Sequence, residues 1–267
     1  MTSFRKYLIL VLLLAGFTSQ PVLAQQGLTY DRNHPPSLQE ILDARETFEY
    51  EVKFGFLTLG WIDVELLPDT LYQGRSMYHM RTRIRSNSRV PLVGHREVVY
   101  ESFFTTRNDS MFGELFWRDD VHEEEFDRVR ILFERQAGQV IFLERGEPTD
   151  TLALNEPASG GDIVFYYSRL FAGTDDRFQL PVYIENEEGF LEMSHGTRTG
   201  MQSYDAFKEP INTYFAEGRT DIDGPFGFSG RYRSWYSTDD LRVPVEAHVR
   251  TIFGNVRVRL IHYEREN

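Results

Sequence analysis

The sequence of 267 residues predicts an all-β protein in which a curled antiparallel sheet forms a barrel or a half-barrel, with one or two short helices. From Thr47 onward, hydrophobic and polar side chains alternate with a period of two, which is typical of half-buried strands. Short turns join most of the alternating segments, and short connections favour antiparallel neighbours. The sequence indicates ten to twelve strands, and a twisted sheet of that width tends to curl rather than stay flat.

The first segment of the chain has the pattern of a secretory signal peptide over residues 1–24. Arg5 and Lys6 precede the apolar run 8–17, and the segment ends with Val22-Leu23-Ala24, a small-residue cleavage site. Ten apolar residues in a helix span about 15 Å, half of a ~30 Å hydrocarbon core, so a membrane anchor is not expected. No later stretch approaches 18 apolar residues. We therefore expect an exported bacterial protein of the periplasm or the outer-membrane periphery, not transmembrane after cleavage.

The next segment, residues 25–45, is a polar leader with two interpretations. Ser37 and Glu40 have the spacing of a capping box, which predicts a short helix over 38–44. The alternative is a flexible leader without regular structure. The sequence does not decide between them.

Residues 46–264 are predicted to form a single antiparallel β domain, because no repeat or linker divides them. The alternating segments, in chain order, are 47–54, 60–66, 78–85, 98–104, 112–117, 129–133, 140–143, 178–184, 190–193, 226–236, 243–252 and 255–263. Segments 129–133 and 140–143 read as one hairpin, and 178–184 and 190–193 as another. Only 162–171 has helical spacing, so we expect a short helix there with Asp162 as its N-cap.

A short motif stands near the C-terminus, with Trp235, Ser237 and Asp239 at alternate positions and Pro244 five residues after the aspartate. Together with the first strands, 48–55 and 59–61, it resembles the family of exported bacterial proteins catalogued as domain of unknown function 3108. The resemblance covers roughly 47–262. It implies an antiparallel β-rich envelope protein and supplies no activity.

The motif itself has a structural and a catalytic interpretation. Ser237 and Asp239 favour turns in which their side chains bond backbone amides, and Pro244 suits a strand start. Alternatively, Asp239 or Asp240 could act with a distant carboxylate as the acid and base of a hydrolase on envelope glycans. No nucleophile-elbow pattern is present, and we assign no catalytic residue.

Arginines are concentrated in the segment 75–96, which has no acidic residue. The candidate contacts with an anion or a partner protein are Arg81, Arg83, Arg85, Arg89 and Arg96. Guanidinium groups two residues apart on a strand could hold carboxylates or phosphates. The alternative is pairing within the chain, because residues 119–127 contain six carboxylates on what could be a neighbouring strand.

Composition excludes several classes of function. The net charge of -12 argues against nucleic acid as a partner. Without cysteine there is no disulfide, thiolate nucleophile or cysteine zinc site. The seven histidines show no paired-ligand spacing, and His122 beside the carboxylates 123–125 is more typical of a solvated loop than of a metal site. We expect neither a metal nor a cofactor.

Aromatic side chains suggest the function that the sequence favours. The chain has 21 Phe, 14 Tyr and 3 Trp, and a wide curled sheet can enclose more space than its own side chains fill. The favoured hypothesis is a non-enzymatic envelope protein that binds an apolar or amphiphilic ligand, such as a lipid, or an outer-membrane partner. The alternatives are the carboxylate-dependent hydrolase and a protein-interaction module that uses the basic strand.

Overall fold

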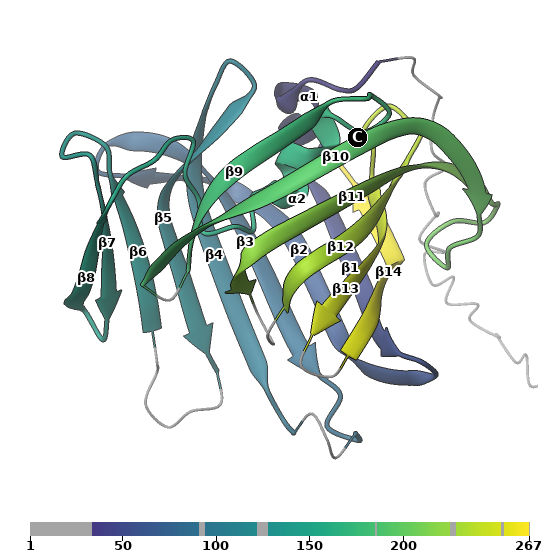
Figure 1. The fold of residues 1–267 in the computed structure, drawn as a ribbon, viewed down its shortest axis with the longest axis horizontal. Helices are drawn as coiled ribbons and strands as arrows, with labels where there is room; N and C mark the ends of the chain where they lie inside the picture. The colour runs from purple at the N-terminus through teal and green to yellow at the C-terminus, as the bar shows by residue number, and fades with distance from the viewer. Residues whose placement is uncertain are drawn as a thin grey trace, which may run out of the picture.

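The computed structural model describes residues 34–90, 94–121, 128–184, 186–224, 228–251 and 254–266. These residues form one antiparallel sheet of fourteen strands, in the spatial order β8-β7-β6-β5-β4-β3-β2-β1-β14-β13-β12-β11-β10-β9 (Figure 1). Strands β1 to β8 follow one another as a meander, and so do β9 to β14. The two meanders join where β1 pairs with β14, which brings the first and last strands of the domain together.

The strands of the first meander are β1 Glu46–Phe54, β2 Leu57–Tyr72, β3 Arg75–Ser86, β4 Glu97–Arg107, β5 Ser110–Asp120, β6 Arg128–Glu134, β7 Gln139–Glu144 and β8 Glu147–Ala153. The strands of the second are β9 Arg177–Ile184, β10 Glu187–Gln202, β11 Ile211–Gly224, β12 Phe228–Ser237, β13 Pro244–Thr251 and β14 Gly254–Arg265.

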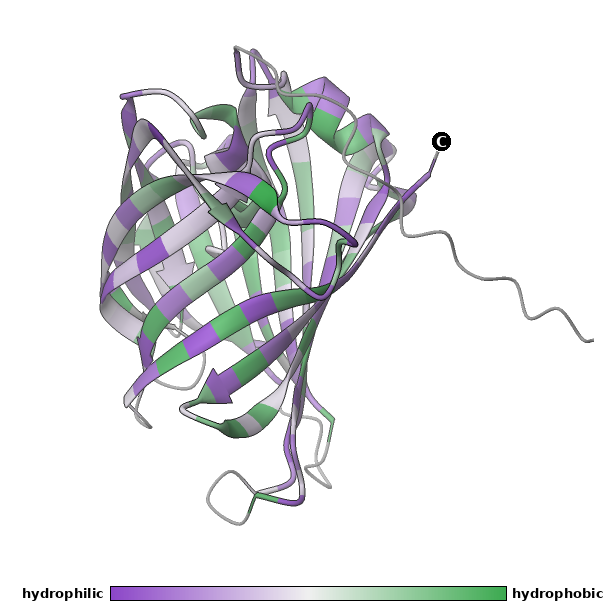
Figure 2. Ribbon diagram, turned by 90° about the vertical axis from the view of Figure 1, so that its right-hand side faces the viewer, coloured by the Kyte–Doolittle hydropathy of each residue, from purple (hydrophilic) through white to green (hydrophobic). Residues whose placement is uncertain are grey.

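The curled antiparallel sheet that the alternation predicts is confirmed, and each of the twelve alternating segments overlaps a strand. Figure 2 shows hydrophobic and hydrophilic residues alternating along the strands, which gives the sheet one apolar and one polar face. In β1, for example, Phe48 and Tyr50 are buried inside the sheet, whereas Thr47 is exposed. Burying one such aromatic side chain contributes about 1.5–3 kcal/mol.

Two strands lie outside the predicted segments. The side chains of β8 are almost all exposed, so the strand lacks an apolar face and shows no alternation. Strand β11 buries mostly small or polar residues, such as Thr213 and Ala216, because the strand beside it carries the large ones. At Gly218 a Cβ atom would lie 2.2 Å from the ring of Tyr232, so only glycine leaves room for that ring.

The sheet does not close strand to strand, since β8 and β9 are its two edges. A connecting segment, 158–160, spans the gap: Gly113 of β5 donates its N–H to the carbonyl of Ala158 at 2.8 Å, and Tyr183 of β9 donates its N–H to Ser159 at 3.0 Å. Strands β6 to β8 extend beyond this link and pack Phe142 against the Tyr183 ring. The edge of β9 is thus covered, which removes an exposed pairing edge.

Helix α1, Leu38–Asp43, lies at one end of the curled sheet, the upper end in Figure 1. Ser37 Oγ accepts a hydrogen bond from the Glu40 N–H, and the Glu40 carboxylate accepts one from the Ser37 N–H, so the capping box is formed. The side chains of Leu38, Ile41 and Leu42 are buried in the main core. From His34 onward, therefore, the predicted leader is a docked part of the domain.

The predicted helix over 162–171 is shorter than expected. Helix α2 covers Val164–Tyr167 and continues into a single 3-10 turn, η1, over Ser168–Leu170. The expectation that Asp162 caps this helix is wrong, because the N-cap is Ile163 and no side chain caps it. Figure 1 shows α2 between the front strands β9 to β12 and the back strands β2 to β4, and Tyr166 is fully buried there.

Candidate ligand-binding interior

The inside of the curled sheet contains three adjoining cavities. A lower cavity of 230 Å³ is lined by Val52, Val256 and their neighbours, a central cavity of 280 Å³ extends up to α2, and a lateral cavity of 190 Å³ extends toward β5 and β6. The residues that line two or more of them are Ile62, Thr82, Ile84, Asp162, Val164, Leu191, Phe228, Val249 and Val258. All but Thr82 and Asp162 are apolar. The combined volume of the three cavities lies within the range of small-molecule binding sites, roughly 300–1,000 Å³.

The two ends of this interior differ. At the upper end, α1 and α2 fill the space between the strands. At the lower end, where the turn 54–57 between β1 and β2 lies, no helix is present among the residues that the structure describes. Phe56 is 91% exposed there, at the tip of the β1–β2 hairpin, and Phe54 lies against Gly254 with 43% of its surface exposed.

Asp162 is an acidic group inside this apolar interior and lines both the central and the lateral cavity. Its two carboxylate oxygens lie 2.6 and 2.7 Å from the Ser102 hydroxyl, which donates to them, and Oδ1 also accepts from the Ile163 N–H at 3.0 Å. Burial raises the pKa of the carboxyl to about 6, because the charged form is poorly solvated there. Sequence reasoning missed this role and considered Asp162 only as a helix cap.

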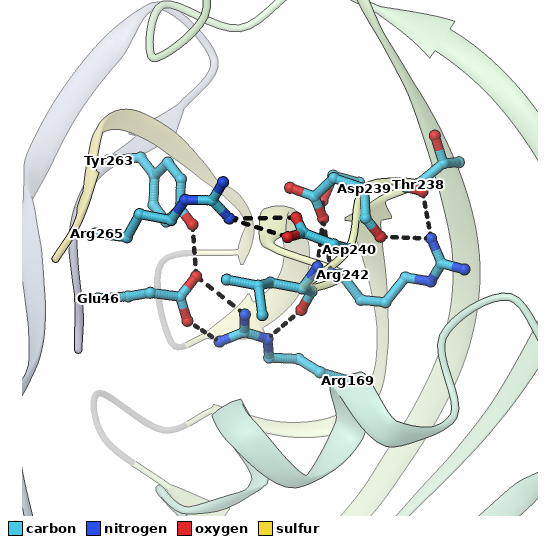
Figure 3. Close-up of polar contacts among 10 residues, drawn as sticks. Glu46, Arg169, Thr238, Asp239, Asp240, Arg242, Tyr263 and Arg265 are labelled. Atoms are coloured by element: carbon cyan, nitrogen blue, oxygen red, sulfur yellow. Dashed lines mark hydrogen bonds and ion pairs between the residues drawn. The ribbon is translucent and has the colours of Figure 1, made fainter. Parts of the chain in front are cut away.

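A second buried polar group joins the internal helix to the sheet (Figure 3). Arg169 of η1 and Glu46 of β1 are fully buried and form a bidentate pair, at 2.6 and 3.0 Å. Tyr263 donates its hydroxyl to Glu46 at 2.6 Å, and the Leu241 carbonyl accepts from Arg169 Nε at 2.8 Å. The pair spans 123 positions of sequence, and no local pattern indicates it. The charged groups of Arg169 and Glu46 bond to each other and to neighbouring protein groups. We therefore infer that this pair holds η1 and α2 in position against the sheet.

The C-terminal motif forms a buried turn between β12 and β13. Asp239 Oδ1 accepts from the Ser237 hydroxyl at 2.7 Å and from the N–H groups of Leu241 and Arg242 at 3.1 and 2.7 Å. The guanidinium of Arg242 in turn donates to the carbonyls of Thr238 and Asp239. Burial raises the pKa of Asp239, and only 2% of the residue is exposed. These are the backbone contacts of a turn.

The rest of the motif is also held within the fold. Pro244 is the first residue of β13, where its missing N–H is tolerated. The ring of Trp235 packs on His248, with centroids 4.6 Å apart. Asp240 pairs with Arg265 at 3.2 Å. Neither Asp239 nor Asp240, the two candidates for one carboxylate of the glycan hydrolase, lines the three interior cavities.

Arg81, Arg83 and Arg85 of β3 pair with carboxylates on the two neighbouring strands. Arg81 contacts Glu101 of β4 at 2.8 Å and Glu65 of β2 at 3.3 Å. The remaining pairs are Arg83 with Glu97 at 2.8 Å and Arg85 with Asp63 at 2.8 Å. At partly exposed sites such pairs contribute about 0.2–1 kcal/mol each.

The expectation that residues 119–127 supply these partners is therefore wrong for the pairs above. The reason is topology, since β4 lies between β3 and the strand that carries Asp119. Residues 122–127, His122 among them, lie outside the described residues. Arg89 and Arg96 are exposed in the connection between β3 and β4. The backbone N–H of Arg89 donates to the Asn87 side chain, and the backbone N–H of Arg96 donates to the Ser86 hydroxyl.

Comparison with known proteins gives a likeness of fold. No family model and no curated protein matches the chain, so the resemblance to domain of unknown function 3108 stays a prediction. A solved β-barrel-like protein of the domain of unknown function DUF1849, from Brucella abortus, aligns with a TM-score of 0.52 and 11% identity, over 84% of this chain and 99% of that one. A protein with a YmcC-like fold from Bacteroides fragilis aligns with a TM-score of 0.34 and 7% identity, over 86% of this chain and 98% of that one.

No helix among the described residues has both the length and the apolar character needed to cross a membrane. No cluster of three or more His, Asp or Glu side chains in this part of the chain is arranged to hold a metal ion.

Proposed function

We propose that this protein is an exported, non-enzymatic cell-envelope protein that binds an amphiphilic ligand inside its curled sheet. The observation that supports the proposal best is the set of three adjoining cavities, which share Ile84 and Phe228 in their walls. A close-packed domain leaves few voids larger than a water molecule, whereas this interior has room for an alkyl chain. Removing such a chain from water stabilises the complex by about 0.8 kcal/mol per CH₂ group.

Export rests on the predicted signal peptide and places the protein where lipids and other amphiphiles are abundant. The ligand enters from the lower end, past the exposed rings of Phe54 and Phe56. The arginine strand contributes less to this proposal, because Arg81, Arg83 and Arg85 already have carboxylate partners in the chain.

The proposal is tested by filling the interior. Ile84 lines all three cavities and Val249 lines two of them, so Ile84→Trp and, separately, Val249→Phe would occupy the space. The control is Leu71→Trp, because Leu71 is 78% exposed at the opposite end. The probe is N-phenyl-1-naphthylamine, whose fluorescence rises in apolar surroundings, titrated into the mature chain.

We expect the wild type and Leu71→Trp to bind the probe equally, and both filled variants to bind it at least about tenfold more weakly. Circular dichroism establishes which variants fold, and each cavity position gives an independent answer. A wild type that binds no probe, or folded filled variants that bind it as tightly as the wild type, would overturn the proposal. Lipid extraction of the purified protein then identifies the natural ligand.

A further inference from the structure

Asp162 is the acidic side chain that faces two of the interior cavities. It follows the connecting segment 158–160 and precedes α2, so the backbone brings its carboxylate to the boundary between the central and the lateral cavity. The residue is half-buried within the curled sheet, and it lines both of these cavities.

The carboxylate has spare capacity to accept hydrogen bonds. An ionised carboxylate offers about four acceptor positions. Within the chain it receives one hydroxyl proton, from Ser102, which both oxygens share, and two N–H groups, from Ile163 and from its own backbone. About one position is therefore free to accept a donor from a molecule in the cavity.

No ion pair joins Asp162 to a cation among the residues that the structure describes. Arg118 lines the lateral cavity but lies opposite Tyr100, one step nearer the lower end than the Ser102–Phe116 pair. Glu246 also lines the central cavity, but its carboxylate is directed to His248 and Arg259, with Oε1 2.7 Å from His248 Nε2 and Oε2 3.7 Å from Arg259 Nε. Asp162 is thus an anion in apolar surroundings with neutral hydrogen-bond donors only.

Such a group selects among ligands by their charge. A buried anion is costly unless it is paired, so an ammonium or hydroxyl group that donates to it stabilises both partners. A carboxylate or phosphate placed beside it would be repelled, and the low dielectric of the interior strengthens that repulsion. We infer that Asp162 is the polar anchor of the interior, and that the ligand is a single-chain amphiphile whose polar end donates hydrogen bonds through an ammonium or a hydroxyl group.

This inference rests on the proposed function, since it specifies the ligand of the same cavities. The polar end lies against Asp162, and the alkyl chain extends past Ile84 and Phe228 toward the lower end. Phosphorylated lipids with an acidic head group are excluded from this orientation by the same repulsion.

The test compares three probes of equal chain length: dodecylamine, dodecanol and dodecanoate. Each displaces N-phenyl-1-naphthylamine from the mature chain at pH 7.5, below the critical micelle concentration. The variants are Asp162→Asn, which keeps the size of the side chain and loses its charge, and Glu246→Gln, which removes a nearby carboxylate that is already paired with His248 and Arg259.

We expect the wild type to bind dodecylamine at least about tenfold more tightly than dodecanoate, because a charge-assisted hydrogen bond is involved. Asp162→Asn should lose most of that preference, and Glu246→Gln should retain it. Equal binding of the three probes, or a preference that survives in Asp162→Asn, would overturn the inference and leave the proposed function standing. A wild type that binds none of the probes would overturn both.

Discussion

Replacing Asp162 with asparagine should make the protein more stable near neutral pH. Burial raises the pKa of this carboxyl from its ordinary 3.8 to about 6. One pKa unit corresponds to about 1.36 kcal/mol, so the ionised group costs the folded state about 3 kcal/mol. Asparagine has a similar shape, can accept the same bonds from Ser102 and Ile163, and carries no charge. We expect a gain of about 1–3 kcal/mol at pH 7.5, because the added amide needs an acceptor of its own.

The sign of the pH dependence makes this prediction specific. A raised carboxyl pKa means that the folded protein binds the proton more tightly than the unfolded chain. The wild type therefore loses stability as the pH rises through the interval from about 4 to 6, and the full cost is present above it. Asparagine does not titrate, so the advantage of the variant should be largest at pH 7.5 and vanish near pH 4.

The assay is urea unfolding of wild type and variant at several pH values between 4 and 7.5, with Asp150→Asn as the control. Asp150 is exposed and should show no pH-dependent difference. The reasoning is refuted if the difference between Asp162→Asn and wild type does not change with pH, or if the variant is the less stable protein at pH 7.5.

Four further changes test other parts of the structure. Arg169→Met removes the cationic partner of the buried Glu46 carboxylate and should lower the unfolding free energy by about 3–5 kcal/mol. Adding Glu46→Gln should restore part of that stability. A loss below about 1 kcal/mol would contradict the conclusion that the two side chains form a buried ion pair. Ile41→Ala should cost about 2–5 kcal/mol in urea unfolding, whereas no change would mean that α1 does not dock. Burial lowers the pKa of His195 to about 4, so the wild type should lose about 3 kcal/mol of stability as the pH falls from 6.5 toward 4. His195→Phe should lack that loss. A variant whose stability changes with pH as the wild type's does would refute the conclusion that His195 is buried in its neutral form. Phe56→Ser should leave the urea midpoint unchanged, since Phe56 is 91% exposed, and slow the uptake of dodecanol from lipid vesicles; uptake at the wild-type rate would exclude the hairpin tip from the ligand's path.

Local signals account for the elements that the sequence predicted. The alternation in β1 and β14 predicted both strands, and the Ser37–Glu40 spacing left a helix as one of two possibilities. Strand β8 was missed because it has no buried face, and β11 because its buried side chains are small. Both segments become strands because they pair with a neighbouring strand, and the local sequence pattern does not show which strand that is.

The sequence by itself determined the all-β class and the antiparallel pairing of neighbours, because alternation and short turns act between residues close in the chain. Only the tertiary structure decided the pairing of β1 with β14, the bridge at 158–160 and the internal position of α2. It also decided the chemistry, since Asp162 meets Ser102 across 60 positions of sequence. Interactions over such distances depend on how the whole sheet curls, and that depends on every strand together.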